Sequence, residues 1–351
     1  MNEDVWSKQD TDPDEIEAAM RGLLFRRHAE NEALIPVRVL NLVVIVDRQW
    51  KGEIANRLER VGRYQASRTL LCAVEEGRTT LDAVASVSYD EPNAGGIGLV
   101  REHVEIDLGP EHLAAIETIV DPVLAGEMPT IAWAPHGHSD AIRRMLPLID
   151  VILLDSDDLP DPVDAFARAK RLCGGAYVVD LAWLRTTPWR ERLAASFDLP
   201  QRLAALRRIA KLEVRHQDMS VASGLLLAGW LASRLSWDVE PLVAQGPGVM
   251  RGSAHRDGGD VALCMRTFDQ MAPGLAGVTV TGERGSSLSL QRGSGGLDAE
   301  ERIFDGPLRE WKILGASRGE GGILGEGVRQ ALLRDPTYNP ALDAAQDLCP
   351  L

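Results

Sequence analysis

The sequence predicts an α/β protein: a doubly wound, mixed but mainly parallel sheet, followed by a smaller α+β domain with an antiparallel sheet. In the first half of the chain, continuous apolar runs of strand length alternate with segments of helical periodicity, which is typical of a parallel sheet covered on both faces. Beyond residue 246, glycine becomes frequent and short segments alternate apolar and polar residues. This second pattern is typical of antiparallel strands.

The composition indicates an ordinary soluble globular protein of more than one domain. The chain has 351 residues, of which 45% are hydrophobic, and a net charge of −14. The negative charge argues against a general binder of nucleic-acid phosphates. The acidic N-terminal stretch has no signal-peptide pattern, and no apolar run reaches the roughly 18 residues of a membrane span. We therefore expect a cytoplasmic protein with no nucleic-acid or membrane partner.

The cysteines are too far apart to form a recognisable zinc or disulfide framework, so we expect reduced thiols. They are Cys72, Cys173, Cys264 and Cys349. Cys72 lies within an apolar strand and should be buried, whereas Cys349, near the chain end, should react first with a thiol reagent.

The first elements predict a strand, helix, strand unit. Residues 1–12 should form a flexible tail, after which Asp12, Pro13 and Glu15 supply the cap, first-turn proline and capping-box acid of a helix. A central strand over 38–47, a helix, and a strand over 67–76 follow.

Two alternating segments, 80–90 and 101–109, predict an antiparallel hairpin within or beside the sheet. Parallel order then resumes. The remaining elements of this part are a helix from 110 to about 125, a strand over 130–135, a helix to about 148, a strand over 150–157, a helix over 162–173 and a strand at 177–181.

The second half begins with a segment over 200–216 that we interpret as a helix with a basic and an apolar face. Residues 221–237 are apolar on almost every side and predict a buried helix, in which Gly224 and Gly229 permit close neighbours. Short antiparallel strands and a helix over 324–334 follow. The predicted domains are therefore 13–215 and 216–340, with an irregular tail over 341–351.

The stretch over 180–198 is the most distinctive in the chain. A buried strand turns into a helix that we expect to begin at Pro188, with Thr187 as its N-cap. Trp189 lies on the apolar face and should be core. Arg190 would lie near the positive end of the helix dipole, so it should be held by an anion. This anion is either on a partner protein or an internal acid such as Asp155 or Asp180.

These motifs, in this order, resemble those of the glucose-6-phosphate dehydrogenase assembly proteins, the OpcA family. The matching segments are RVLNLVVIVD, SRTLLC, DVILLDS, DLAWLRTTPWRERLAASFD and LLLAGWLASRLSW. The resemblance covers most of the chain. It implies a non-catalytic partner that promotes assembly or activation of glucose-6-phosphate dehydrogenase. We expect no cofactor and no metal.

The chain departs from the family pattern in two loops. Residues 65–68 read Gln-Ala-Ser-Arg where relatives tend to carry His-Pro-Ser-Arg, and TIAWAPHGH replaces a strand end richer in tryptophan. In cyanobacterial relatives, activation is linked to the redox state of thiols. The cysteine spacing of this chain gives no sign of such control, so the resemblance is not taken to imply it.

The candidate site residues come from the family motifs, and we expect them to bind or support the partner. They are Trp183, Arg185, Thr187, Pro188, Trp189, Arg190, Asp155, Ser156, Ser67 and Arg68. The strand-to-helix turn at Trp183 lies at the carboxyl edge of the predicted sheet, where this architecture presents residues to ligands.

Other chemistries have weaker support. Asp155, Asp157 and Asp158 could hold Mg²⁺, but a solvated loop is the better interpretation because no second acidic cluster accompanies them. His136, His138 and Asp140 fit a turn better than a metal site. The Gly319–Gly321 segment lacks the third glycine of a dinucleotide fingerprint, and no phosphate loop or nucleophile elbow occurs.

The leading hypothesis is thus a regulatory subunit that binds and activates the dehydrogenase and is not itself an enzyme. Two alternatives remain: an α/β enzyme acting on a phosphorylated metabolite, and a sensor that binds a sugar phosphate, for which the basic segment 202–215 is a secondary candidate. The oligomeric state of the chain is open.

Overall fold

The computed structural model describes residues 2–30, 34–35, 38–62, 67–89, 98–198, 200–303, 306–315, 320–331 and 333–350. Two compact units make up the chain. Unit 1 contains residues 1–154, 172–179 and 324–332, and unit 2 contains residues 155–171, 180–323 and 333–351. These units do not coincide with the predicted limits 13–215 and 216–340, because residues 180–215 belong to unit 2. The limits of separately folding domains stay a prediction.

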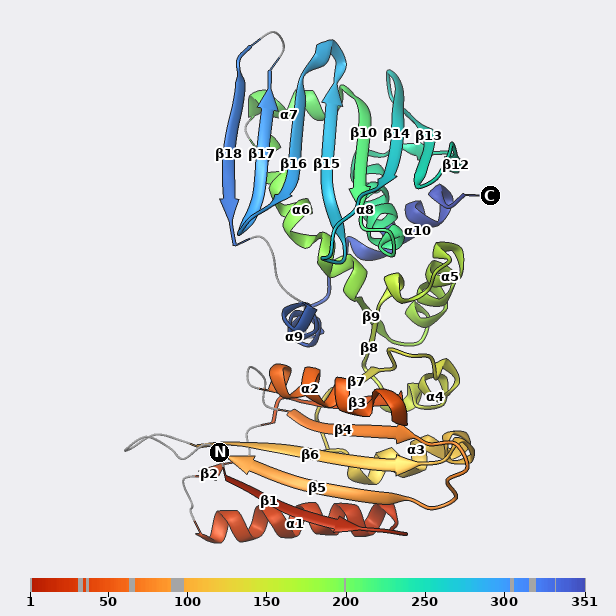
Figure 1. Ribbon diagram of the computed structural model, residues 1–351, viewed down its shortest axis with the longest axis vertical. Coiled ribbons are helices and arrows are strands. Elements are labelled where there is room, and N and C mark those ends of the chain that lie inside the picture. Colours follow the sequence, from red (N-terminus) through yellow and green to blue (C-terminus); the bar gives the residue numbers. More distant parts are fainter. Residues whose placement is uncertain are drawn as a thin grey trace. The chain divides into compact units, whose positions relative to one another are not determined.

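Unit 1 is built on a mixed, mainly parallel sheet, as predicted (Figure 1). Its strand order is β1-β5-β6-β4-β3-β7-β8-β9, with β2 beside β6. Pairing is parallel from β6 to β8 and antiparallel between β1, β5 and β6. The strands are β1 (Asn2–Lys8), β2 (Leu34–Ile35), β3 (Leu40–Asp47), β4 (Ser67–Val74), β5 (Asp82–Tyr89), β6 (Gly98–Leu108), β7 (Thr130–Trp133), β8 (Val151–Leu154) and β9 (Tyr177–Asp180).

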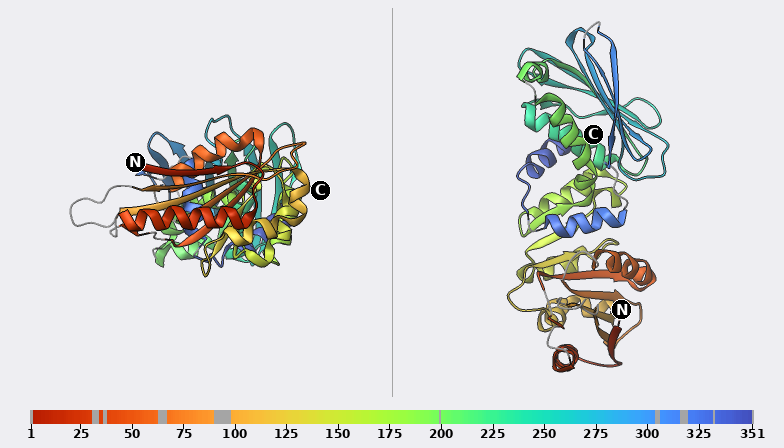
Figure 2. Two further views of the ribbon diagram at one scale, coloured as in Figure 1. Left: turned by 90° about the horizontal axis from the view of Figure 1, so that it is seen from below. Right: turned by 90° about the vertical axis from the view of Figure 1, so that its left-hand side faces the viewer.

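Helices cover both faces of this sheet, which explains why its central strand β3 is almost entirely apolar. Every residue of β3 from Leu40 to Val46 is buried. Figure 2 (left) shows α1 and α2 on opposite faces. The helices of unit 1 in this part of the chain are α1 (Pro13–Glu30), α2 (Lys51–Gly62), α3 (Ile116–Val120) and α4 (Ser139–Arg144). Helix α5 (Pro162–Cys173) follows and belongs to unit 2 except for its last two residues.

The predicted flexible tail at 1–12 is wrong over its first part, because β1 pairs with β5 from Asn2 to Lys8. An edge strand exposes many of its side chains, so its sequence needs few apolar residues. The predicted hairpin over 80–90 and 101–109 is confirmed, since β5 and β6 are antiparallel neighbours. The linking residues 90–97 lie outside the described part of the chain.

Unit 2 contains a second sheet with the order β11-β13-β14-β10-β15-β16-β17-β18, with β12 beside β13. All registered pairs are antiparallel except β10 with β14. The strands are β10 (Ile209–His216), β11 (Asp238–Val239), β12 (Val243–Ala244), β13 (Val249–Arg256), β14 (Gly259–Thr267), β15 (Leu275–Gly282), β16 (Ser287–Gly293), β17 (Gly296–Arg302) and β18 (Leu308–Leu314).

Helices of unit 2 gather on one face of its sheet (Figure 2, right). They are α6 (Leu181–Phe197), α7 (Pro200–Leu206), α8 (Val221–Leu235) and α10 (Tyr338–Leu348), while α9 (Glu320–Gln330) lies mostly in unit 1. The prediction that α8 is buried with close-packed glycines is confirmed. A Cβ on Gly229 would come within 2.3 Å of the Ala341 carbonyl oxygen, and one on Gly224 within 2.6 Å of Met265.

Two predictions for unit 2 are wrong. The segment 200–216 is not one helix but α7 followed by strand β10, in which buried Leu212 and Val214 alternate with more exposed residues. The irregular tail predicted over 341–351 is largely helix α10, which buries Leu342, Ala345 and Leu348 at helical spacing.

Candidate functional site

The best-organised polar cluster of unit 2 begins at Asp180, a fully buried carboxylate that caps helix α6. It accepts hydrogen bonds from the Ala182 amide at 2.9 Å, the Ser156 amide at 3.0 Å, the Ser156 hydroxyl at 2.5 Å and the Tyr338 hydroxyl at 3.0 Å. Four donors hold this acid in its ionised form, while burial opposes ionisation and, with the nearby Asp155 charge, raises its pKa to about 6.

This cap corrects the predicted helix start. Helix α6 begins at Leu181, so Pro188 lies inside the helix and Thr187 is not its N-cap. Proline was expected at the first position because it lacks an amide hydrogen. The strong cap at Asp180 starts the helix earlier, and the Thr186 hydroxyl donates to the Trp183 carbonyl at 2.7 Å in the turn before the proline. Trp189 is 1% exposed, which confirms its prediction as a core residue.

Arg185 and Asp155 form a buried bidentate ion pair. The two guanidinium nitrogens donate to the two carboxylate oxygens at 2.7 and 2.6 Å, and both side chains are 8% exposed. Asp157 lies 3.5 Å from the same guanidinium and accepts from the Ser223 amide at 3.0 Å and hydroxyl at 2.5 Å. The cluster therefore ties α6, α8 and the segment after β8 together.

The other two acids of the cluster, Asp157 and Asp158, have pKa values close to neutral pH. Burial is the largest cause, and repulsion from the Asp155 carboxylate adds to it, so that the pKa values of Asp157 and Asp158 are raised to about 7. Arg185 opposes both shifts but has one charge to share among three neighbouring carboxyls. Groups with such shifted pKa values mark sites where a change of charge costs little near neutral pH.

Arg190 does have an acidic partner, but it is Asp335 and neither Asp155 nor Asp180. Its guanidinium lies 3.5 Å from the Asp335 carboxylate and 3.5 Å above the centre of the Trp183 ring. Trp183 donates its indole N–H to Asp335 at 2.9 Å. Burial lowers the pKa of Arg190 to about 10. No local sequence pattern predicts this ion pair, because Asp335 lies in a distant segment of the sequence.

The structure therefore brings most of the predicted motif residues together, but inside unit 2. Trp183 and Arg185 are 3% and 8% exposed, and their polar groups bond to residues of the same unit. Sequence reasoning missed Asp335 and Tyr338, which contact Trp183, and Ser223, which donates to Asp157. That these residues bind or support a partner protein remains a prediction.

Ser67 and Arg68 belong to unit 1, at the start of β4. The Arg68 guanidinium donates to the buried Glu102 carboxylate at 2.7 Å and to the Val123 carbonyl at 2.8 Å, while the Ser67 hydroxyl lies 3.2 Å from that of Thr69. The Arg68 bonds join β4 to β6 and to the turn at residues 121–123, while the Ser67–Thr69 contact lies within β4. Gln65 and Ala66, where the chain departs from the family pattern, lie outside the described residues, as does Gly319.

The histidines after β7 make contacts of other kinds. His136 stacks on Trp50 with ring centres 4.7 Å apart, and His138 bonds to Asp47 at 2.9 Å. Within the described ranges, no three side chains of metal-binding type are grouped so as to hold a metal ion. None of the described helices is long and apolar enough to cross a membrane.

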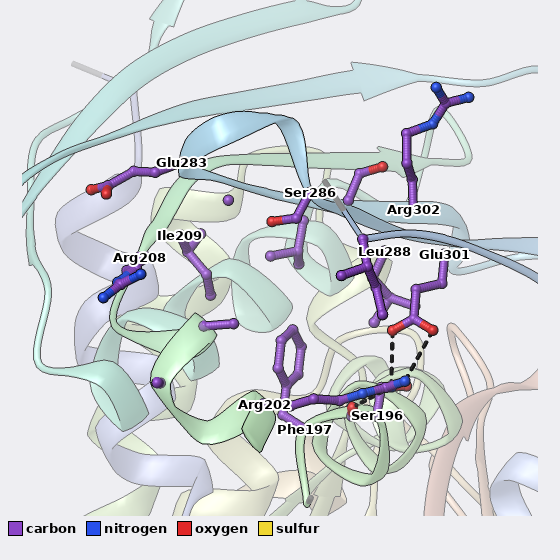
Figure 3. Close-up of a pocket in the computed structure, with 16 residues that line it drawn as sticks. Ser196, Phe197, Arg202, Arg208, Ile209, Glu283, Ser286, Leu288, Glu301 and Arg302 are labelled. Atoms are coloured by element: carbon purple, nitrogen blue, oxygen red, sulfur yellow. Dashed lines mark hydrogen bonds and ion pairs between the residues drawn. The ribbon is translucent and has the colours of Figure 1, made fainter. Parts of the chain in front are cut away.

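A cavity of about 210 Å³ lies in unit 2 between the end of α6, α7 and the sheet (Figure 3). Phe197, Ile209 and Leu288 give it an apolar lining. On one side, Arg202 bonds to Glu301 at 2.9 Å and to the Ser196 carbonyl at 3.0 Å. Arg208 also lines the cavity, is exposed, and has no ion pair among the described residues. The predicted basic segment thus contributes separate arginines rather than one helix face.

Fold and site together define a two-unit α/β protein in which a buried charge network joins helix α6 to the segment before α10. A family model described as the glucose-6-phosphate dehydrogenase subunit N-terminal domain matches residues 58–171, and one described as the corresponding C-terminal domain matches residues 176–342. The chain belongs to this family, the OpcA family.

Two cyanobacterial relatives carry names that assign them provisionally to the OxPP cycle as OpcA proteins. The one from Nostoc punctiforme is 32% identical over 131 residues, which cover 35% of this chain and 28% of the relative. That from Synechococcus elongatus is 28% identical over 172 residues, covering 48% and 39%. The matched part of the chain thus spans well under half of each relative.

Among solved structures, the chain is similar to a myo-inositol 2-dehydrogenase from Lactobacillus plantarum. The identity is 10% and the TM-score 0.44, with 88% of this chain and 94% of the other covered. A likeness at this level supports no conclusion about activity.

Proposed function

We propose that this chain is a non-catalytic assembly and effector subunit that binds and activates glucose-6-phosphate dehydrogenase in the oxidative pentose phosphate pathway. The observation that carries the proposal is the match of two models of dehydrogenase subunit domains to residues 58–171 and 176–342. The names of the cyanobacterial relatives support the pathway.

The geometry of unit 2 supports a role in which the motif positions a binding surface. Because Trp183 and Arg185 are almost fully buried, they would act by fixing helix α6 and the segments bonded to it. Thr187, Pro188 and Arg190 are less buried and lie on the same helix. They are our candidates for residues close enough to the surface to respond when a partner binds.

The test uses the full chain and the dehydrogenase of the same organism, purified separately. We expect the two to elute together in gel filtration and the rate of NADP reduction to rise with chain concentration until it saturates. The chain alone should neither bind NADP nor oxidise glucose 6-phosphate, since no dinucleotide fingerprint opens a helix in its sequence. Separate elution with an unchanged rate would contradict the proposal, and so would glucose 6-phosphate oxidation by the isolated chain.

A second candidate function is a sensor of a phosphorylated sugar, favoured by the cavity beside Arg202 and Arg208. Calorimetric titration with glucose 6-phosphate tests it. If the cavity binds the phosphate, Arg208→Glu should abolish the heat of binding, whereas Arg207→Glu should leave it unchanged because Arg207 is exposed next to the cavity but does not line it. No measurable heat with the unaltered chain would exclude this ligand.

A further inference from the structure

Strand β18 ends the sheet of unit 2 and has an open edge (Figure 1). It pairs with β17 on one side, and no strand among the described residues pairs with the other. Large apolar side chains are exposed along it: Leu308 is 45% exposed, Trp311 38% and Leu314 74%. An exposed edge strand with apolar side chains is a place where another strand can add to a sheet.

The sequence of β18, LREWKIL, is complementary to itself when two copies run antiparallel. With Trp311 opposite Trp311 of a second copy, Glu310 stands opposite Lys312 and Leu308 opposite Leu314, each pair occurring twice. Because side chains alternate between faces, the two ion pairs and two leucine pairs lie on one face and the tryptophan pair on the other. Shifting the register by one residue would break all of these pairs.

Glu310 has no cationic partner among the residues that the structure describes. It stands directly opposite Glu300 of β17, and like charges at such positions are destabilising. No ion pair of Glu310 is found among the described residues. Lys312 makes two long contacts: its ammonium lies 3.4 Å from the Asp298 carboxylate, with both side chains about half exposed, and 3.4 Å from the Ser294 carbonyl. Lys312 of a second copy would supply a cationic partner for Glu310.

We propose that the chain forms a symmetric dimer through antiparallel pairing of β18 with β18 of a second copy, which joins the two sheets into one. The pairing is isologous, as a two-fold axis requires, since each strand supplies both halves of every pair. The self-complementary charges favour a second copy over a strand of another protein. One strand pair is a small interface, so the dimer should be weak, with a Kd on the order of 10 µM.

The test is sedimentation equilibrium of the full chain over a range of concentrations. We expect the mass to rise from 38.2 kDa towards twice that value. Glu310→Lys and Lys312→Glu should each weaken the dimer by about tenfold or more, because each places two like-charge pairs across the axis. A mixture of these two variants should form a heterodimer, and the double variant should dimerise like the unaltered chain.

One control variant and a folding check keep the outcome clear. Arg251→Glu changes an exposed charge on β13, towards the other edge of the same sheet, and should leave the dimer unchanged. Circular dichroism and thermal melting of each variant test for misfolding. Dimer formation in the mixture of Glu310→Lys and Lys312→Glu would also show that both variants are folded.

A cysteine test fixes the register, in a chain with Cys173 replaced by serine. Trp311→Cys should give a disulfide-linked dimer on oxidation, because residues directly opposite in an antiparallel pair lie about 4.5–5.5 Å apart at Cα. Leu308→Cys should not, since its two copies would be separated by roughly 20 Å. A chain that stays monomeric at concentrations well above the expected Kd, or a dimer that Glu310→Lys leaves as tight as before, would overturn the proposal.

Discussion

Replacing Arg190 by alanine tests whether the buried network holds unit 2 together. The change removes the guanidinium stacked 3.5 Å above Trp183 and 3.5 Å from Asp335. It also removes hydrogen bonds donated to the hydroxyls of Thr186 at 2.9 Å and Thr187 at 3.0 Å. Asp335 keeps its bonds from Trp183 and Thr337, so its carboxylate is not left entirely unpaired.

The cost follows from these contacts. A desolvated cation over an indole ring contributes about 2 kcal/mol, and breaking a buried ion pair by removing one partner costs about 3–5 kcal/mol. The ion pair here is long and Asp335 is partly exposed, so the ion-pair contribution falls below that range. Burial of the cation, which lowers the pKa of Arg190, offsets part of the gain. We expect a net loss of about 2–4 kcal/mol, or roughly 5–15 °C in the melting temperature of unit 2.

Differential scanning calorimetry of the full chain measures this loss. Arg192→Ala is the matched control. It removes an arginine two positions along the same helix that makes no side-chain hydrogen bond or ion pair with a described residue, so the melting temperature should change little. Arg190→Lys should fall between the two, because an ammonium keeps the charge but not the flat contact with the ring. A shift below about 2 °C for Arg190→Ala would refute the reasoning about the network.

Three other measurements test the packing and the charges. The pKa of Asp158, raised to about 7, means that the folded state binds more protons than the unfolded state between about pH 4 and 7, so this residue lowers stability as pH rises through that window. Asp158→Asn should therefore stabilise the protein, relative to the unaltered chain, more at pH 8 than at pH 5 in urea unfolding, and a difference independent of pH would contradict the assignment. Mass spectrometry after brief alkylation should find Cys173 labelled before Cys349, against the prediction from chain position, because Cys349 is 8% exposed and burial raises its pKa to about 12. Gly229→Ala should lower the free energy of unfolding by about 1–3 kcal/mol, since its Cβ would meet the backbone of α10, whereas Gly22→Ala, with nothing within 4 Å, should raise it by up to about 1 kcal/mol; equal effects would contradict the close approach.

Local patterns were enough to predict much of the fold. The apolar run at 38–47 becomes the central strand β3 because both faces of its sheet are covered, and the alternation at 80–90 and 101–109 becomes a hairpin. The apolar segment 221–237 becomes α8, and its predicted close packing at Gly229 is present. In each case the signal lies within one segment, which is all that periodicity can report.

The strand β10 shows how a local pattern can be misread. Charged Lys211, Glu213 and Arg215 alternate with apolar Leu212 and Val214, which is the period of a strand. The apolar and basic residues of α7 immediately before it extend this alternation into an apparent helix period. Because the two elements meet without a glycine or proline, no breaker marks the change from helix to strand.

The sequence identified several residues of the site, but neither their burial nor their bonding partners. Strand ends and a strand-to-helix turn identified Asp155, Trp183 and Arg185. Two other members of the network come from distant segments: Asp335, which accepts from Trp183, and Ser223, which donates to Asp157. A motif can therefore be distinctive because each of its polar side chains has a specific internal partner. It follows that loss of dehydrogenase activation in a Trp183 or Arg185 variant has two possible causes, a disturbed surface or a destabilised unit. Only variants that melt normally can assign residues of this motif to partner binding. Such a variant is easiest to obtain at the less buried Thr187, because among the described residues its hydroxyl makes one hydrogen bond, accepted from Arg190 at 3.0 Å.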